Sequence, residues 1–169
     1  MSVAVVDTNV VLVANGQHAD VSGTCVATCA VELQNIMQRG KLALDDQFRI
    51  LGEYLHKTQP KKGNRPGDAF VKWALQNRVN VMRVDSVTLQ AHDTRGFESF
   101  PNDAELANFD DPDRKFVAVA NAHPAKPPVL QAADSKWLDW APALARHGVA
   151  VEFLCKSDIT RFHEKKFGA

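Results

Sequence analysis

Apolar positions along the chain fall into short continuous runs that alternate with longer stretches of helical spacing. The first run, Val3 to Val6, ends at Asp7 and is typical of a strand buried on both faces of a parallel sheet. Between Val21 and Met37 the apolar residues recur every three or four positions, and Gly40 follows as a helix stop. The opening of the chain therefore predicts a strand followed by an amphipathic helix.

The middle of the chain continues this alternation. It predicts a strand over residues 41–44, a helix over 48–55, a loop over 59–67, a helix over about 68–77 and a strand over 79–84. Residues 86–109 have no clean period. We therefore expect the stretch 60–109 to include a longer surface excursion with short helical pieces.

The last third of the chain opens on a helix start signal. Asp111 precedes Pro112, which predicts Asp111 as the N-cap and Pro112 in the first helical position. Strands follow over residues 129–133 and 148–154. Because strands that alternate with helices imply crossover connections, we predict one α/β domain over residues 1–155, with a mainly parallel central sheet and helices on both faces. A basic C-terminal tail over 156–169 completes the chain.

Composition narrows the classes of function. The 169 residues carry 20 basic and 20 acidic side chains, so the formal net charge is zero and global charge does not attract a nucleic acid. The apolar stretch from Val3 to Val13 is interrupted by polar residues and has no basic flank, so it predicts neither a signal peptide nor a membrane span. Three cysteines without zinc-site spacing suit a reducing compartment, and we interpret Cys25, Cys29 and Cys155 as small core residues. We expect a cytoplasmic protein.

Several predicted strands run directly into aspartate. Asp7 and Asp134 each follow a strand, Asp113 lies in the first turn of a predicted helix, and Glu53 lies two turns into another helix. The carboxyl ends of parallel strands share one edge, so these carboxylates converge, and a hard divalent cation such as Mg²⁺ or Mn²⁺ offsets their mutual repulsion. Other acids near strand ends are interpreted as turn or cap residues: Asp45, Asp46, Asp85 and Asp111.

Four segments carry a more specific signal. They are VVDTNVVL at residues 5–12, ILGEYL at 50–55, DRKFVAVA at 113–120 and VLQAAD at 129–134. Their order and spacing resemble the PIN-domain nucleases over residues 3 to about 154. The resemblance implies a PIN-like fold, an RNA substrate, and a small antitoxin protein and a homodimer as partners to test. It also implies a set of metal-binding catalytic acids, namely Asp7, Glu53, Asp113 and Asp134, with Thr8 and Asn9 supporting the first.

The chain departs from the family pattern in three places. Relatives often carry Thr or Ser two residues before the last acid, where this chain has Ala132. On a helical wheel Glu53 points away from the face made by Leu51 and Leu55, so Glu32 on the first long helix is the alternative second acid. The stretch 60–109 also makes this chain longer than the compact toxin members of the family.

Charge is unevenly distributed although the total cancels. From His56 to Arg83 there are seven basic residues and one acid. This run follows the helix that carries Glu53, so it predicts a surface for the nucleic-acid backbone, although a solvated face explains it equally well. The residues proposed to bind nucleic acid are Lys61, Lys62, Arg65 and Lys72. The basic tail is a second candidate, and Phe70 and Trp73 are candidates for base stacking.

These observations predict an endoribonuclease that hydrolyses phosphodiester bonds with Mg²⁺ or Mn²⁺, held as one or two ions by the acidic residues. The alternative is a catalytically inactive PIN-like or receiver-like module that binds Mg²⁺, RNA or a protein without cleavage. A receiver needs an aspartate at a mid-chain strand end, for which Asp85 is available, and a lysine at a late strand end, where only Lys156 follows. A phosphatase needs an Asp-x-Asp pattern that Asp7-Thr8-Asn9 lacks.

Overall fold

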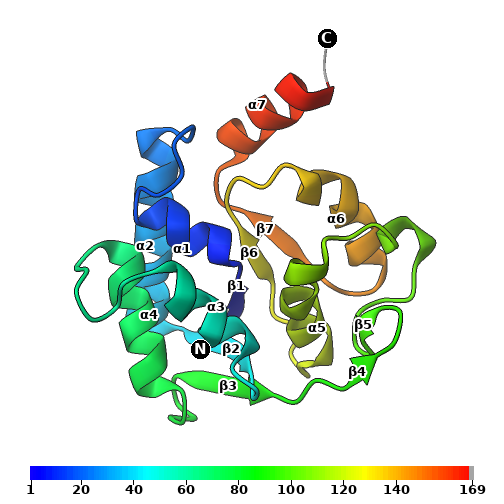
Figure 1. Cartoon of the computed structure of the whole chain (residues 1–169), viewed down its shortest axis with the longest axis horizontal. Coiled ribbons are helices and arrows are strands. Elements are labelled where there is room, and N and C mark those ends of the chain that lie inside the picture. The colour runs from blue at the N-terminus through cyan, green and yellow to red at the C-terminus, as the bar shows by residue number, and fades with distance from the viewer. Residues whose placement is uncertain (168–169) are drawn as a thin grey trace.

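The computed structural model describes residues 1–167 and consists of a parallel sheet flanked by helices (Figure 1). The sheet has five strands in the spatial order β3-β2-β1-β6-β7, and every neighbouring pair is parallel. The strands are β1 (Val3–Val6), β2 (Lys41–Asp45), β3 (Val84–Val87), β6 (Val129–Gln131) and β7 (Val151–Phe153). The predicted α/β class with a parallel sheet is confirmed.

Helices cover both faces of the sheet. In Figure 1, α1, α2 and α4 lie on one side, and α5 and α6 lie on the other. The helices are α1 (Thr8–Ala14), α2 (Gly23–Arg39), α3 (Arg49–Lys57), α4 (Pro66–Asn77), α5 (Arg114–Ala122), α6 (Lys136–Arg146) and α7 (Lys156–Phe167). Within residues 1–167, no helix is long and apolar enough to cross a membrane.

The strand order reverses direction at β1. The chain builds β1, β2 and β3 outward in one direction, then returns to place β6 on the free side of β1 and β7 beyond it. In open parallel sheets, ligands bind at the carboxyl ends of the strands where the order reverses. The fold therefore directs attention to the ends of β1 and β6, which are followed by Asp7 and Asp134.

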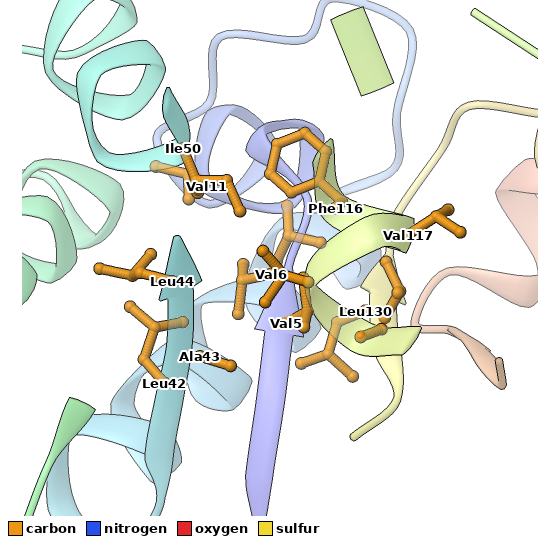
Figure 2. Packing of buried hydrophobic residues seen from close by; sticks show 14 of the residues in the cluster. Val5, Val6, Val11, Leu42, Ala43, Leu44, Ile50, Phe116, Val117 and Leu130 are labelled. Atoms are coloured by element: carbon orange, nitrogen blue, oxygen red, sulfur yellow. The ribbon is translucent and has the colours of Figure 1, made fainter. Parts of the chain in front are cut away.

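The core forms around β1, which is buried on both faces. Val5 and Val6 are fully buried and pair with Val129 and Leu130 of β6. Phe116 from α5 is labelled with Val6 in Figure 2 and is also fully buried. Removing a large side chain from such a core lowers the free energy of unfolding by on the order of 3–5 kcal/mol. This close packing holds the carboxyl end of β1 in a fixed position.

Three helices of the structure were not predicted from the sequence. Helix α1 continues directly from the first strand, α6 follows β6, and α7 occupies the predicted basic tail, of which residues 168 and 169 lie outside the described residues. Helix α1 is apolar nearly all round, because it is enclosed by α2, α3 and α4. An apolar run of this length has no period that distinguishes a helix from a strand.

The predicted strand over 79–84 is wrong in position. Residues 81–83 form a turn, and strand β3 occupies Val84–Val87 instead. Val79 and Val81 are exposed, so their alternation with polar residues does not mark a buried strand face. Asp85 consequently lies inside β3, where it pairs with Lys41 at the amino end of β2.

The predicted surface excursion is partly buried and adds apolar residues to the hydrophobic core. Its strands β4 (Ala91–His92) and β5 (Gly96–Phe97) form a small antiparallel ladder, and a 3₁₀ turn spans Ala104–Leu106. Phe109 is buried, with its ring centroid 5.0 Å from that of Trp137 on α6. The aromatic residues that make these contacts are not spaced as in a helix or a strand, so the sequence of this segment shows no hydrophobic period.

The cysteines also depart from the prediction. Cys25 on α2 and Cys155 before α7 form a disulfide between residues 130 positions apart, whereas Cys29 is free and buried. All three cysteines are buried in the core, as predicted, but the bond between Cys25 and Cys155 was not expected from the sequence. The disulfide attaches the amino end of α7 to α2, and Asp158 of α7 accepts hydrogen bonds from the backbone and hydroxyl of Ser22 in the same region.

Candidate metal centre

Asp7 lies at the carboxyl end of β1 and begins the candidate site. Its Oδ2 accepts a 2.9 Å hydrogen bond from the backbone N–H of Asn9, so Asp7 caps α1. Its side chain is buried, and Oδ1 has no hydrogen-bond partner among the described residues. A buried carboxylate oxygen without a hydrogen-bond partner destabilises the folded protein. This oxygen is therefore available as a ligand for a cation.

Three further acids gather beside it. Asp134 follows β6, and Asp113 ends the 3₁₀ turn Asp111–Asp113 that leads into α5. One carboxylate oxygen from each of these residues and one from Asp110 all lie within 4.8 Å of one another. These three acids form one cluster at the reversal of the strand order, and Asp7 is near enough that, besides its burial, the charges of Asp113 and Asp134 raise its pKa.

Asp110 was not among the predicted site residues. The sequence signal was present in the run Asp110-Asp111-Pro112-Asp113, because two acids three positions apart face the same side of a tight helical turn. Asp111 does not act as the predicted N-cap, since α5 begins at Arg114 and Asp111 is exposed and paired with the Arg114 side chain. Asp45, by contrast, accepts hydrogen bonds from the backbone N–H groups of Gln47, Arg49 and Ile50, which fits its interpretation as a turn residue.

Glu53 reaches the site from α3. The hydroxyl of Thr8 donates a hydrogen bond to its Oε2, and Nζ of Lys115 lies 3.1 Å from its Oε1. The negative charge of Glu53 also raises the pKa of Asp113. The alternative acid, Glu32, lies on α2. Its negative charge adds to the effect of burial in raising the pKa of Cys29, and burial followed by repulsion from Glu152 of β7 raises the pKa of Glu32 itself. The structure therefore brings Glu53 to the other acids and leaves Glu32 elsewhere.

The acids destabilise one another in their charged forms. Burial, followed by repulsion from Asp113, raises the pKa of Asp7 to about 8. Burial, followed by repulsion from Asp134 and Glu53, raises the pKa of Asp113 to about 6. The pKa of Asp134 is raised as well, mainly by burial. Charged carboxylates in this arrangement need positive charge, and oxygen ligands alone are the donor set that Mg²⁺ and Mn²⁺ prefer.

Two lysines supply part of that charge. Lys136 Nζ lies 2.9 Å from Asp110, and Lys115 Nζ lies 3.1 Å from Glu53. Neither lysine was predicted from the sequence, where each lies two residues after an acid that carried the signal. Both ammonium groups stand at the rim of the acidic cluster, where they can neutralise a carboxylate or contact an anionic substrate.

Neighbouring amides hold the chain around the acids. Oδ1 of Asn9 accepts a hydrogen bond from the backbone N–H of Ala133, directly before Asp134. Ala132 occupies the position where Thr or Ser was expected, but Oε1 of Gln131 accepts hydrogen bonds from the backbone N–H groups of Ala132 and Asp134. Gln131 also lowers the pKa of Asp7, against the larger effect of burial. Gln131 thus supports the turn that presents Asp134.

The predicted nucleic-acid residues lie away from this cluster. Lys61 and Lys62 line a separate cavity of about 420 Å³ with Leu55. Arg65 pairs at 3.0 Å with the buried carboxylate of Asp68. Lys72 is an exposed residue of α4. Phe70 is fully buried, so it cannot stack on a base, and Trp73 is half-buried against it.

Asp85, the residue that a receiver would phosphorylate, also lies apart from the acids. It pairs with Lys41 at 2.5 Å and with His123 at 2.8 Å. These two partners hold the pKa of Asp85 below its ordinary value although burial acts in the opposite direction.

Comparisons with protein families, with characterised proteins and with solved structures find no significant match.

Proposed function

We propose that this chain is a metal-dependent nuclease of PIN-like type that hydrolyses phosphodiester bonds in RNA. The observation that carries the proposal is the convergence of Asp7, Glu53, Asp113 and Asp134, joined by Asp110, at the reversal of the strand order. The four acids named first are those that the resemblance to PIN-domain nucleases selects. The preference for RNA, and a small antitoxin or a homodimer as partner, rest on that resemblance alone.

In this proposal the chain's own residues divide the work. Asp7, Asp113 and Asp134 hold one or two Mg²⁺ or Mn²⁺ ions, which when bound lower the pKa of a water and polarise the scissile phosphate. Glu53, oriented by Thr8 and Lys115, positions the attacking water and accepts its proton. Lys136, which pairs with Asp110 at 2.9 Å, lies close enough to the cluster that its ammonium group would face a non-bridging phosphate oxygen of a bound substrate.

A second candidate function is binding without cleavage. It is favoured by Lys115 and Lys136, which pair with two of the acids and compete with a cation for them. A receiver-like version of this candidate loses its support, because Asp85 lies inside β3 and is paired with Lys41 and His123.

The deciding experiment is RNA cleavage by the purified protein with Mg²⁺ or Mn²⁺. We expect cleavage that excess chelator and Asp7→Asn each abolish, because both remove the ion that activates water. Glu53→Gln is expected to reduce cleavage strongly, whereas the matched control Glu32→Gln leaves it unchanged. Equal cleavage in excess chelator contradicts the metal mechanism, and binding of RNA with no cleavage under any metal supports the second candidate.

A further inference from the structure

A cavity of about 400 Å³ opens directly beside the candidate metal centre. Its lining includes Asn9 and Asp134 of that centre, together with His18 from the loop after α1 and Phe162 from α7. A space of this size lies within the range of small-ligand sites. The cavity therefore places one turn of α7 next to the acids although α7 is far from them in sequence.

A second cavity continues from the first. It has a volume of about 420 Å³ and shares Asp20 and Phe162 with the first cavity. Its other lining residues are the cations of the last turns of α7, Arg161, Lys165 and Lys166. We call the two cavities together the α7 path, since they lead from Asp134 along the end of this helix.

A pair of stacked rings stands where the two cavities meet. The ring centroids of His18 and Phe162 lie 5.9 Å apart with an interplanar angle of 23°. The guanidinium carbon of Arg161 lies 5.0 Å from the Phe162 centroid and fixes this ring from a further direction. A flat aromatic side chain at the wall of a polar cavity suits a nucleobase, because every base offers a π-face for stacking.

The charge along the α7 path suits a phosphate backbone. Lys165 is exposed and forms no ion pair within residues 1–167. The positive charge of Lys166 lowers the pKa of Asp134, against the larger effect of burial. Arg161 has a structural role, since it bonds to Asp158 and to the backbone oxygen of Asp20. Among the side chains that the structure describes, the large exposed apolar ones lie elsewhere, at Met1, Val31, Phe48, Val79, Val81 and Met82, so the described lining of the α7 path lacks the anchors of a protein interface.

We propose that the α7 path binds single-stranded RNA, with one base stacked at Phe162 and the adjoining phosphate bound by Lys165 and Lys166. A single strand is required because a paired base keeps its faces covered by its neighbours. The choice of RNA rests on the proposed function of the adjacent metal centre. The path replaces the segment around Lys61 and Lys62 as the route by which the substrate reaches the acids.

The test measures binding of a short labelled RNA in chelator at low salt, where no cleavage interferes. Phe162→Leu keeps an apolar side chain but removes the ring, and we expect it to weaken binding roughly 5- to 100-fold. Phe162→Trp is expected to restore binding. Phe48→Leu is the matched control, because Phe48 also carries an arginine over its ring, Arg78 at 5.9 Å, but lies outside the path. Thermal melts establish that each variant is folded.

A second measurement asks whether a base is the partner of Phe162. A series of RNAs, each with one abasic position, is bound to the wild type and to Phe162→Leu. We expect one abasic position to weaken binding to the wild type and to have little effect on the variant, since the variant has no ring on which that base could stack. A duplex of the same sequence is expected to bind the wild type more weakly than the single strand does.

The outcomes separate this inference from the proposed nuclease function. If Phe162→Leu and the double variant Lys165→Ala, Lys166→Ala bind and cleave RNA like the wild type, the α7 path is overturned and the nuclease stands. If the wild type binds RNA with the abasic pattern described but never cleaves it, the path stands and the nuclease function is wrong. Equal binding of duplex and single strand, or a larger loss from Lys61→Ala, Lys62→Ala, also overturns the path.

Discussion

Oδ1 of Asn9 accepts a 2.7 Å hydrogen bond from the backbone N–H of Ala133, which joins segments 124 positions apart. Asn9 lies two residues after Asp7, and Ala133 lies one residue before Asp134. The bond therefore holds the ends of β1 and β6 in register at the point where their acids face each other. The backbone N–H of Asn9 takes part in the cap of α1, and its side chain has the further role of positioning the segment before Asp134.

Neutralising Asp113 is expected to stabilise the metal-free protein. Asp113 makes no side-chain capping bond to α5, and its carboxylate is repelled by Asp134 and Glu53. Asp113→Asn should raise the free energy of unfolding in chelator by on the order of 1 kcal/mol while abolishing cleavage. Asp111→Asn is the control from the same turn, exposed and outside the cluster, and is expected to leave cleavage intact.

Thermal melts in chelator and in millimolar Mg²⁺ check this prediction. A cation that binds only the folded state raises its stability, so the wild type should melt at a higher temperature in Mg²⁺ and Asp113→Asn should respond less. An Asp113→Asn protein that is less stable than the wild type in chelator, with a wild type indifferent to Mg²⁺, contradicts a metal site.

The stability of the metal-free protein is expected to depend on the protonation of Asp7. Its pKa of about 8 lies far above the ordinary value, so the folded state holds this proton more tightly than the unfolded state does. The contribution to stability is present below about pH 4 and is lost as the pH rises towards 8. Asp7→Asn retains the cap of α1 and removes this loss.

Denaturant unfolding of the wild type and Asp7→Asn in chelator, between pH 5 and pH 8, measures the effect. We expect the variant to gain stability over the wild type as the pH rises. The comparison cancels other carboxylates, such as Asp85 and Asp158, whose pKa values are lowered. A stability difference that stays constant across this range is inconsistent with a buried, protonated Asp7.

The disulfide between Cys25 and Cys155 is expected to contribute about 4 kcal/mol, because it closes a long loop in the unfolded chain. Reduction should therefore lower the melting temperature of the wild type by roughly 10 °C. Cys25→Ala should melt at the same temperature with and without reductant. Cys29→Ala is the control and should keep the sensitivity to reductant, since Cys29 is the free thiol. If reductant does not change the melting temperature of the wild type, the disulfide does not form in solution.

The basic segment predicted from the sequence can be tested by salt dependence. Removing one lysine that binds a phosphate of a single strand reduces the slope of log affinity against log salt concentration by about 0.7. Because Lys61 and Lys62 lie at a separate cavity from the α7 path, we expect Lys61→Ala, Lys62→Ala to leave the slope unchanged. A lower slope would show that these lysines bind RNA. Arg65 is unsuitable for this test, because its loss would leave the buried carboxylate of Asp68 without its cation.

Most of the acidic cluster could be predicted from sequence because its members follow secondary-structure elements. Asp7 directly follows β1 and Asp134 lies three residues after the end of β6, so the topology places both at the same edge of the sheet. Asp110, Lys115 and Lys136 were missed because their place depends on the turn before α5 and on side-chain reach. Glu53 reaches the cluster on the polar side of α3, away from the buried Leu51, where a wheel indicates no partner.

The fold followed the same division. The strands β1, β2 and β6 were predicted, over residues 3–6, 41–44 and 129–133, because each is a short, mainly apolar run next to a turn signal. Helix α1 was missed because burial on nearly all sides removes its period, and residues 79–83 were misassigned because their valines alternate yet face solvent. The spacing of apolar residues reveals a helix or a strand only when one of its faces is buried and the other is exposed. Both wrong predictions concern segments that lack this difference between faces.

The strand order has a consequence for synthesis of the chain. β1 is synthesised before its partner on one side, β6, which begins at Val129, so Val6 can pair with Leu130 only after the intervening elements have been made. Asp7 and Asp134 cannot meet before that moment. If the acids cut RNA, the nascent chain is therefore inert beside the message and ribosomal RNA that surround it.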